Sequence, residues 1–135
     1  MAWTRDQEYA ITTRGKNTIV SAGAGSGKTA VLTERMFRII KNKEANVDEL
    51  LVLTFTNAAA HEMKDRIVAA LRKDNLFSLA DQIEGSNVTT FDAYALSLVK
   101  KYSYFFSLPK DISIIDENII KIKQYEYLDK IFSRK

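Results

Sequence analysis

Apolar residues recur at helical spacing in several stretches of the chain. Between residues 28 and 41 they return every three or four positions, which places them along one side of a helix. The same spacing predicts helices from residue 57 to about 71, from about 95 to 102, and from 117 onward. Shorter helices are predicted over residues 4–11 and 76–83.

Three other stretches have the character of β-strands. Residues 17–21, 49–55 and 88–91 are short, rich in β-prone side chains and bounded by polar segments. The second stretch is continuously apolar, as expected for a parallel strand that is covered on both faces. Because strands and helices alternate, we expect right-handed βαβ units and an α/β fold with a parallel sheet flanked by helices.

Length and composition restrict the class of protein. With 135 residues, 46% of them hydrophobic, the chain can form one globular domain with its own core. It has no cysteine, its first residues are too polar for a signal peptide, and no run approaches the roughly eighteen apolar residues that span a membrane. We therefore expect a cytoplasmic protein without a membrane segment. The net charge of +3 permits nucleic-acid binding but does not argue for it.

A glycine-rich loop lies between the first predicted strand and the next helix. It consists of Ala22, Gly23, Ala24, Gly25, Ser26, Gly27, Lys28 and Thr29. This series fits the phosphate-binding P-loop pattern, except that alanine replaces the first glycine. Small residues let backbone N–H groups converge on an anion, and the following helix adds its positive end. We expect Lys28 to reach the β- and γ-phosphates of a nucleotide, and Thr29 to be a ligand of Mg²⁺; these two are the candidate catalytic residues.

Gln7 has two open interpretations. Residues 4–7 (TRDQ) have the pattern of a capping box, in which Gln7 folds back onto the start of a helix. Alternatively, its amide presents one donor and one acceptor face, which suits the N6/N7 edge of adenine. The residues alone do not decide between the two.

Small polar residues follow each predicted strand, at residues 21–29, 54–57 and 89–92. The carboxyl ends of parallel strands share one edge of a sheet, so we expect a nucleotide at the first junction and another ligand at the other two. Phe55 and Phe91 lie beside hydroxyl groups there, an arrangement that suits stacked bases of a single nucleic-acid strand. Burial of both rings in the core is the alternative. Asp92 is expected to cap the third helix of this series.

Four segments, in order and at compatible spacing, resemble motifs of the UvrD/Rep-type superfamily 1 DNA helicases. Residues 3–7 are similar to the adenine-reading Q motif, residues 22–29 to motif I, residues 53–67 to motif Ia and residues 89–94 to the next DNA-facing motif. Many members have histidine at the place of Asp92, so the role of that residue stays open. Within the family, the wording is most similar to AddA-type helicase–nuclease subunits of bacterial recombinational repair.

The resemblance implies a partial P-loop NTPase domain of the RecA-like kind over residues 1–110, and the start of an inserted helical subdomain over residues 111–135. It implies ATP and Mg²⁺ as cofactors, an adenine contact by Gln7, and 3′–5′ translocation on single-stranded DNA in repair or recombination. The possible partners that it implies are a second motor domain and a nuclease subunit. The implied DNA contacts are Phe55, Thr56, Asn57, Thr90 and Phe91.

Some parts of a complete motor are not found. Residues 114–117 (IIDE) look like a Walker B strand with Asp116 and Glu117 as magnesium ligands, but we favour a helix with an acidic first turn. Without the later motifs, we expect a fragment or truncated gene product that neither unwinds DNA nor turns over ATP well by itself. Self-association through Ile120, Leu128 and Ile131 is also expected. The competing hypotheses are another P-loop protein, such as a kinase, and a DNA-binding remnant without catalysis.

Overall fold

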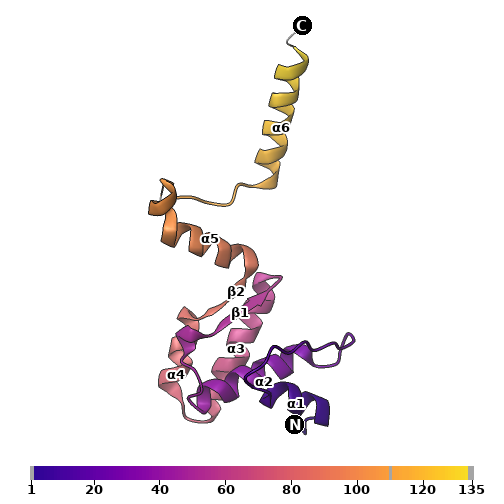
Figure 1. Cartoon of the computed structure of the whole chain (residues 1–135), viewed down its shortest axis with the longest axis vertical. Helices are drawn as coiled ribbons and strands as arrows, with labels where there is room; N and C mark the ends of the chain where they lie inside the picture. Colours follow the sequence, from indigo (N-terminus) through magenta and orange to yellow (C-terminus); the bar gives the residue numbers. More distant parts are fainter. Residues whose placement is uncertain (1, 110, 134–135) are drawn as a thin grey trace. The chain divides into compact units, whose positions relative to one another are not determined.

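The computed structural model describes residues 2–109 and 111–133. The chain forms two compact units, Met1–Tyr94 and Ala95–Lys135, each of which is described by itself. Figure 1 shows the order of their helices and strands along the chain. None of the helices in the described ranges combines the length and apolar character that crossing a membrane requires.

The first unit contains a parallel βαβ arrangement. Its elements are α1 (Arg5–Thr12), α2 (Lys28–Lys41), the 3₁₀ turn η1 (Val47–Glu49), β1 (Leu51–Thr54), α3 (Asn57–Lys73), α4 (Phe77–Gln82), the 3₁₀ turn η2 (Ile83–Gly85) and β2 (Asn87–Thr90). The strands pair in parallel from Leu51 beside Asn87 to Thr54 beside Thr90, and α3 lies against both of them. The unit is therefore α/β, with a small two-stranded sheet.

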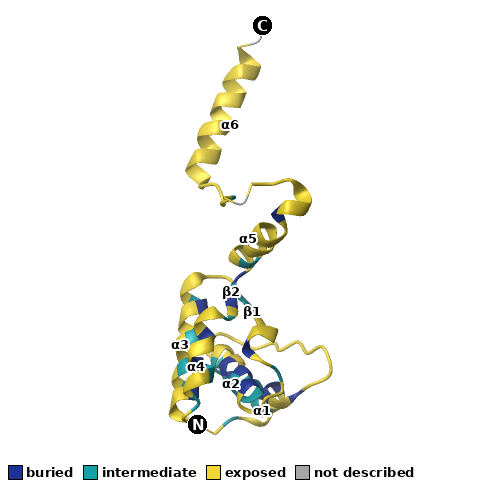
Figure 2. Ribbon diagram, turned by 90° about the vertical axis from the view of Figure 1, so that its left-hand side faces the viewer, coloured by how far each residue is buried: buried dark blue, intermediate teal, exposed yellow. Residues whose placement is uncertain are grey.

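The hydrophobic core lies between the sheet and the helices of this unit. Figure 2 shows its buried residues in dark blue on α2, α3 and the strands. Ile67 and Leu71 of α3 and Ile83 of η2 are fully buried, and Val52 and Val88 contribute from the two strands. A smaller cluster packs α1 on α2 and consists of Ala10, Ile11 and Val31, with Trp3 at its margin.

The strand predicted for residues 17–21 does not form. In the described part of the chain, β1 and β2 pair with each other, and neither pairs with this segment. Ile19 is 97% exposed, and Val20 is more than half exposed. The prediction was wrong because a β-prone composition is not sufficient: a strand needs a neighbour for its backbone N–H and C=O groups and a core for its side chains.

The predicted helices are confirmed, and their caps are largely as expected. Thr4 and Gln7 form the complete capping box of α1, and Thr56 caps α3 by accepting a hydrogen bond from Ala59 N at 3.1 Å. The expectation for Asp92 was wrong. The hydroxyl of Thr90 accepts from Ala93 N at 3.2 Å, and α5 (Phe91–Tyr102) already begins before Asp92, which therefore lies in its first turn.

The second unit comprises the later part of α5, the 3₁₀ turn η3 (Ser103–Phe106) and α6 (Glu117–Phe132). Asp116 caps α6 by accepting a hydrogen bond from Asn118 N at 2.8 Å. Residues 111–115 form no strand, and Ile114 is largely exposed. The favoured interpretation of this segment, a helix start with acidic residues, is confirmed in place of the Walker B strand.

Candidate nucleotide-binding site

The backbone of the glycine-rich loop requires glycine at two positions. Gly25 and Gly27 have φ angles of 75° and 81°, in the left-handed region that other residues adopt at a cost. Gly27 is also the residue immediately before α2, so the loop runs directly into the positive end of that helix. Within the loop, the Ser26 hydroxyl donates to Gly23 O at 2.8 Å and closes a tight turn.

Lys28 lies over the loop to which it belongs. Its ammonium donates to Ala22 O at 2.8 Å and to Gly23 O at 2.7 Å, and the side chain is exposed to solvent. Two neutral carbonyl oxygens thus hold the cation beside the backbone curl. A phosphate would compete well for this ammonium, because hydrogen bonds between charged partners are roughly twice as strong as neutral ones. Thr29, also exposed, follows it in the first turn of α2.

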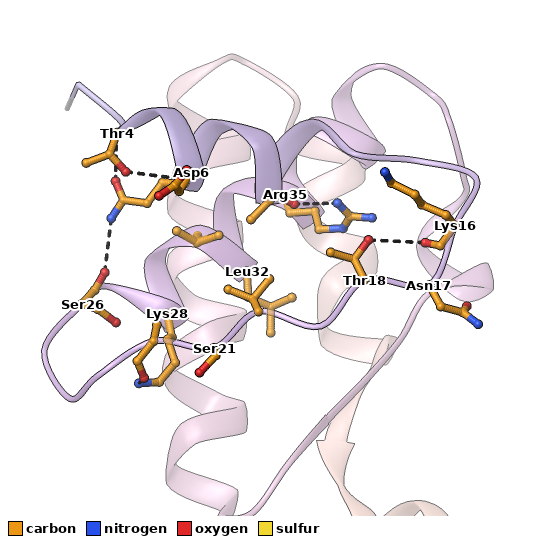
Figure 3. Close-up of a pocket in the computed structure, with 15 residues that line it drawn as sticks. Thr4, Asp6, Lys16, Asn17, Thr18, Ser21, Ser26, Lys28, Leu32 and Arg35 are labelled. Carbon is orange, nitrogen blue, oxygen red and sulfur yellow. Dashed lines mark hydrogen bonds between the residues drawn. The ribbon is translucent and has the colours of Figure 1, made fainter.

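Gln7 connects the first helix to this loop. Its Oε1 accepts from Thr4 N at 2.9 Å, and its Nε2 donates to Ser26 O at 3.2 Å (Figure 3). An amide oxygen has two lone pairs and an amide nitrogen has two hydrogens, so each atom keeps one free position. The capping role and the adenine-reading role are therefore compatible, and the structure places Gln7 beside the loop.

A cavity of about 690 Å³ opens between α1, α2 and residues 16–22. Its volume falls within the usual range for small-molecule pockets. Besides Gln7, Ser26 and Lys28, its lining includes residues that the sequence analysis missed, namely Lys16, Asn17, Thr18 and Arg35 (Figure 3). Arg35 could have been found from its spacing, since it follows Lys28 by seven residues and so shares its helix face. Lys16 carries no comparable signal.

Hydrogen bonds fix two basic residues of the cavity lining. Arg35 Nη1 donates to Ala10 O at 2.7 Å, at the end of α1. Lys16 Nζ donates to the hydroxyl of Tyr9 at 2.7 Å, and this hydrogen bond is the main reason why the pKa of Tyr9 lies below its ordinary value. Both cations therefore connect the cavity wall to α1.

Ion pairs clamp α1 and its following loop onto α2. Arg38 contacts Glu8 through two bonds, Nη1 to Oε1 at 2.5 Å and Nη2 to Oε2 at 3.2 Å, while its Nε donates to Glu34 Oε1 at 2.8 Å. The hydrogen bonds with Glu8 and then with Glu34 raise the pKa of Arg38. Arg14 contacts Glu44 in the same manner, with Nε to Oε2 at 2.5 Å, and lowers the pKa of that carboxyl.

The second and third junctions form a common edge. The hydroxyl of Thr54 donates to Thr56 O at 3.0 Å and to Thr89 O at 3.3 Å, which ties the end of β1 to β2. Phe55 is 95% exposed and Phe91 55% exposed, with ring centroids 6.2 Å apart and a tilt of 35°. Core burial of these rings is therefore excluded. For the first junction the common edge stays a prediction, because no strand leads into it in the described residues.

The geometry defines an α/β protein with a glycine-rich loop in front of a long helix and an exposed aromatic pair at the carboxyl edge of its sheet. Within that class, the chain belongs to the UvrD/REP helicase N-terminal domain family, whose model matches residues 3–135. The family resemblance found in the motifs is confirmed.

Relatives within the family share one description, that of an ATP-dependent helicase/nuclease subunit of the AddA type. The chain is 42% identical over 140 residues to the protein of this description from Heliobacterium modesticaldum, an alignment that covers 98% of this chain and 10% of that protein. It is 41% identical to the one from Clostridium acetobutylicum, with 98% and 11% covered, and 37% identical to that of Oceanobacillus iheyensis, with 96% and 11% covered. The chain thus spans about a tenth of the length of these curated relatives.

Proposed function

We propose that this chain is the ATP-binding part of an ATP-dependent DNA helicase, with a RecA-like P-loop domain over residues 1–110 and the start of an inserted helical subdomain over residues 111–135. The observation that carries the proposal is the hydrogen bond from Gln7 Nε2 to Ser26 O, which brings a base-reading amide onto the phosphate loop. Supporting it, the relatives are named ATP-dependent helicase/nuclease subunits.

The residues of the loop fit the nucleotide. Backbone N–H groups of residues 22–27 and the start of α2 would hold the phosphates, and Lys28 would neutralise their charge. Gln7 would bind adenine through its free donor and acceptor positions. ATP, when bound with Mg²⁺, supplies the free energy for movement on DNA.

The donor chemistry also fits Mg²⁺. The Thr29 hydroxyl is an oxygen ligand of the kind that this cation prefers, and Mg²⁺ commonly takes its remaining ligands from phosphates and water. In the described ranges, His, Cys, Asp and Glu form no group of three or more that could hold a metal by itself. Magnesium binding should therefore depend on the nucleotide.

Single-stranded DNA is the proposed partner of the edge formed by β1 and β2. Phe55 and Phe91 offer two exposed rings on which bases can stack. Thr56, Asn57 and Thr90 lie at the helix starts beside them, where hydroxyl, amide and N–H groups suit phosphates. By its family, the complete protein would move 3′–5′ on this strand, together with a second motor domain and a nuclease subunit.

Hydrolysis needs an acidic ligand of Mg²⁺ and a cation on the transferred phosphoryl group, in addition to the loop. Asp116 is occupied as the cap of α6. We infer that these 135 residues bind ATP better than they hydrolyse it. Strong DNA-stimulated ATPase activity from the chain alone would contradict this part of the proposal.

Two variants with matched controls test the proposal. Lys28→Ala should weaken ATP binding about tenfold or more, because it removes a charged hydrogen-bond donor worth about 1.5–3 kcal/mol, whereas Lys73→Ala at the exposed end of α3 should not. Phe55→Ala should weaken binding of a labelled oligonucleotide by about 1–3 kcal/mol and spare ATP, and Phe77→Ala, also exposed, should change neither. Fluorescence anisotropy measures both affinities. ATP binding without DNA binding would instead favour another P-loop enzyme, such as a kinase.

A further inference from the structure

The first helix is held on α2 unevenly along its length. Its second half is anchored by burial of Ala10 and Ile11 and by Arg35, which donates to Ala10 O. Its first half, which carries Gln7, is only partly buried and depends on polar contacts. The position of the Gln7 amide is therefore set by whatever fixes this first turn and a half.

Two consecutive residues of that half contact opposite ends of α2. Gln7 donates to Ser26 O, just before the helix begins, and Glu8 forms its paired contact with Arg38, near the helix end. Lys28 and Arg38 are about 15 Å apart along the helix axis, at ~1.5 Å per residue. The first half of α1 is thus fixed at two separate points, and only one of them belongs to the phosphate loop.

The second point is built with some precision. Arg38 is held by Glu34 from within its own helix, four residues earlier, which orients the guanidinium before it reaches Glu8. Its remaining nitrogens, Nη1 and Nη2, then meet the two carboxylate oxygens of Glu8 as a fork. A planar fork of this kind restrains direction as well as distance, which a single contact would not do.

We propose that Glu8 is a positioning residue for base recognition: its ion pair with Arg38 holds the Gln7 amide beside the phosphate loop, where it can read adenine. This inference rests on the proposed function. Loss of the pair leaves the loop, Lys28 and the start of α2 untouched, so the recognition of phosphates is unchanged. What changes is the entropy lost when Gln7 is ordered on the base, which ATP binding must then supply.

The test compares Glu8→Gln with Glu34→Gln. Both remove one carboxylate charge from Arg38, but only Glu8 crosses from α1 to α2. Binding of ATP and of inorganic tripolyphosphate, which has no base, is measured by calorimetry on the full chain. Glu8→Gln should weaken ATP roughly two- to fivefold, as for a partly exposed ion pair, and leave tripolyphosphate unchanged. Glu34→Gln should change neither affinity.

A double-mutant cycle separates positioning from a general loss of stability. In a Gln7→Ala background, Glu8→Gln should have no further effect on ATP, because the amide that it positions is gone. Equal weakening of ATP and tripolyphosphate, equal effects of the Glu8 and Glu34 variants, or an undiminished Glu8 effect without Gln7 would each overturn this inference alone. Failure of the unaltered chain to bind either ligand would overturn the proposed function together with it.

Discussion

Two strand-to-helix junctions with the same sequence pattern fold differently. At the second, β1 ends at Thr54 and α3 begins at Asn57, with Thr56 as its cap. At the first, residues 17–21 form no strand, although α2 begins at Lys28, where the helical spacing starts. The helix half of the pattern was therefore sufficient in both places, and the strand half in only one.

The difference lies in what each half requires. A helix satisfies its backbone hydrogen bonds within itself, so local signals such as the left-handed Gly27 and the apolar face of α2 are enough. A strand depends on a neighbour and on a covering layer. Val52 and Val88 have both, since β1 and β2 pair and α3 covers them, whereas Ile19 has neither in the described residues. β-propensity therefore acts as a measure of fit to a half-buried surface.

The largest expected effect tests this account through the covering helix. Ile67→Ala removes a fully buried side chain from α3 and should lower the free energy of unfolding by about 2–5 kcal/mol. Ile19→Ala, in the segment that forms no strand, should change it by less than about 0.5 kcal/mol. Urea unfolding followed by circular dichroism measures both. A large loss from Ile19→Ala would mean that residues 17–21 pack as a strand in solution.

A smaller effect is expected in the glycine-rich loop. Gly27→Ala forces a Cβ into a left-handed conformation and should cost roughly 1–2 kcal/mol. The added Cβ would meet Gln7 Nε2 at 3.6 Å, an ordinary contact, so the cost comes from the backbone and not from a clash. Gly23→Ala meets nothing within 4 Å and has no such φ, so it should be close to neutral. Thermal unfolding of both variants makes the comparison, and equal losses would contradict it.

Features that depend on neighbours in sequence could be predicted. The capping box of Thr4 and Gln7, the cap at Thr56 and the length of α2 all follow from residues within one or two turns. The contact between Gln7 and Ser26 spans nineteen residues, and the pair of Glu8 and Arg38 spans thirty, so no local pattern encodes them. They are set by how α1 crosses α2.

The candidate DNA edge shows the same limit in another form. The sequence left the two phenylalanines undecided between core and surface, because an aromatic residue after a strand is compatible with both. The pairing of Thr54 with Thr90 decides it, since it brings the ends of both strands together and leaves Phe55 and Phe91 exposed beside each other. Register is a property of two strands and cannot be read from either one.

The smallest expected effect concerns the third junction, where the strand forms but the cap was misassigned. Thr90→Ala removes the hydroxyl that accepts from Ala93 N and should cost about 1 kcal/mol, whereas Thr90→Ser keeps the hydroxyl and should cost less. Asp92→Ala removes only a favourable charge near the start of α5, about 0.3–0.5 kcal/mol. Urea unfolding at low salt gives the order of the three. A larger loss from Asp92→Ala than from Thr90→Ala would return the cap to Asp92 and show that strand pairing does not set where this helix begins.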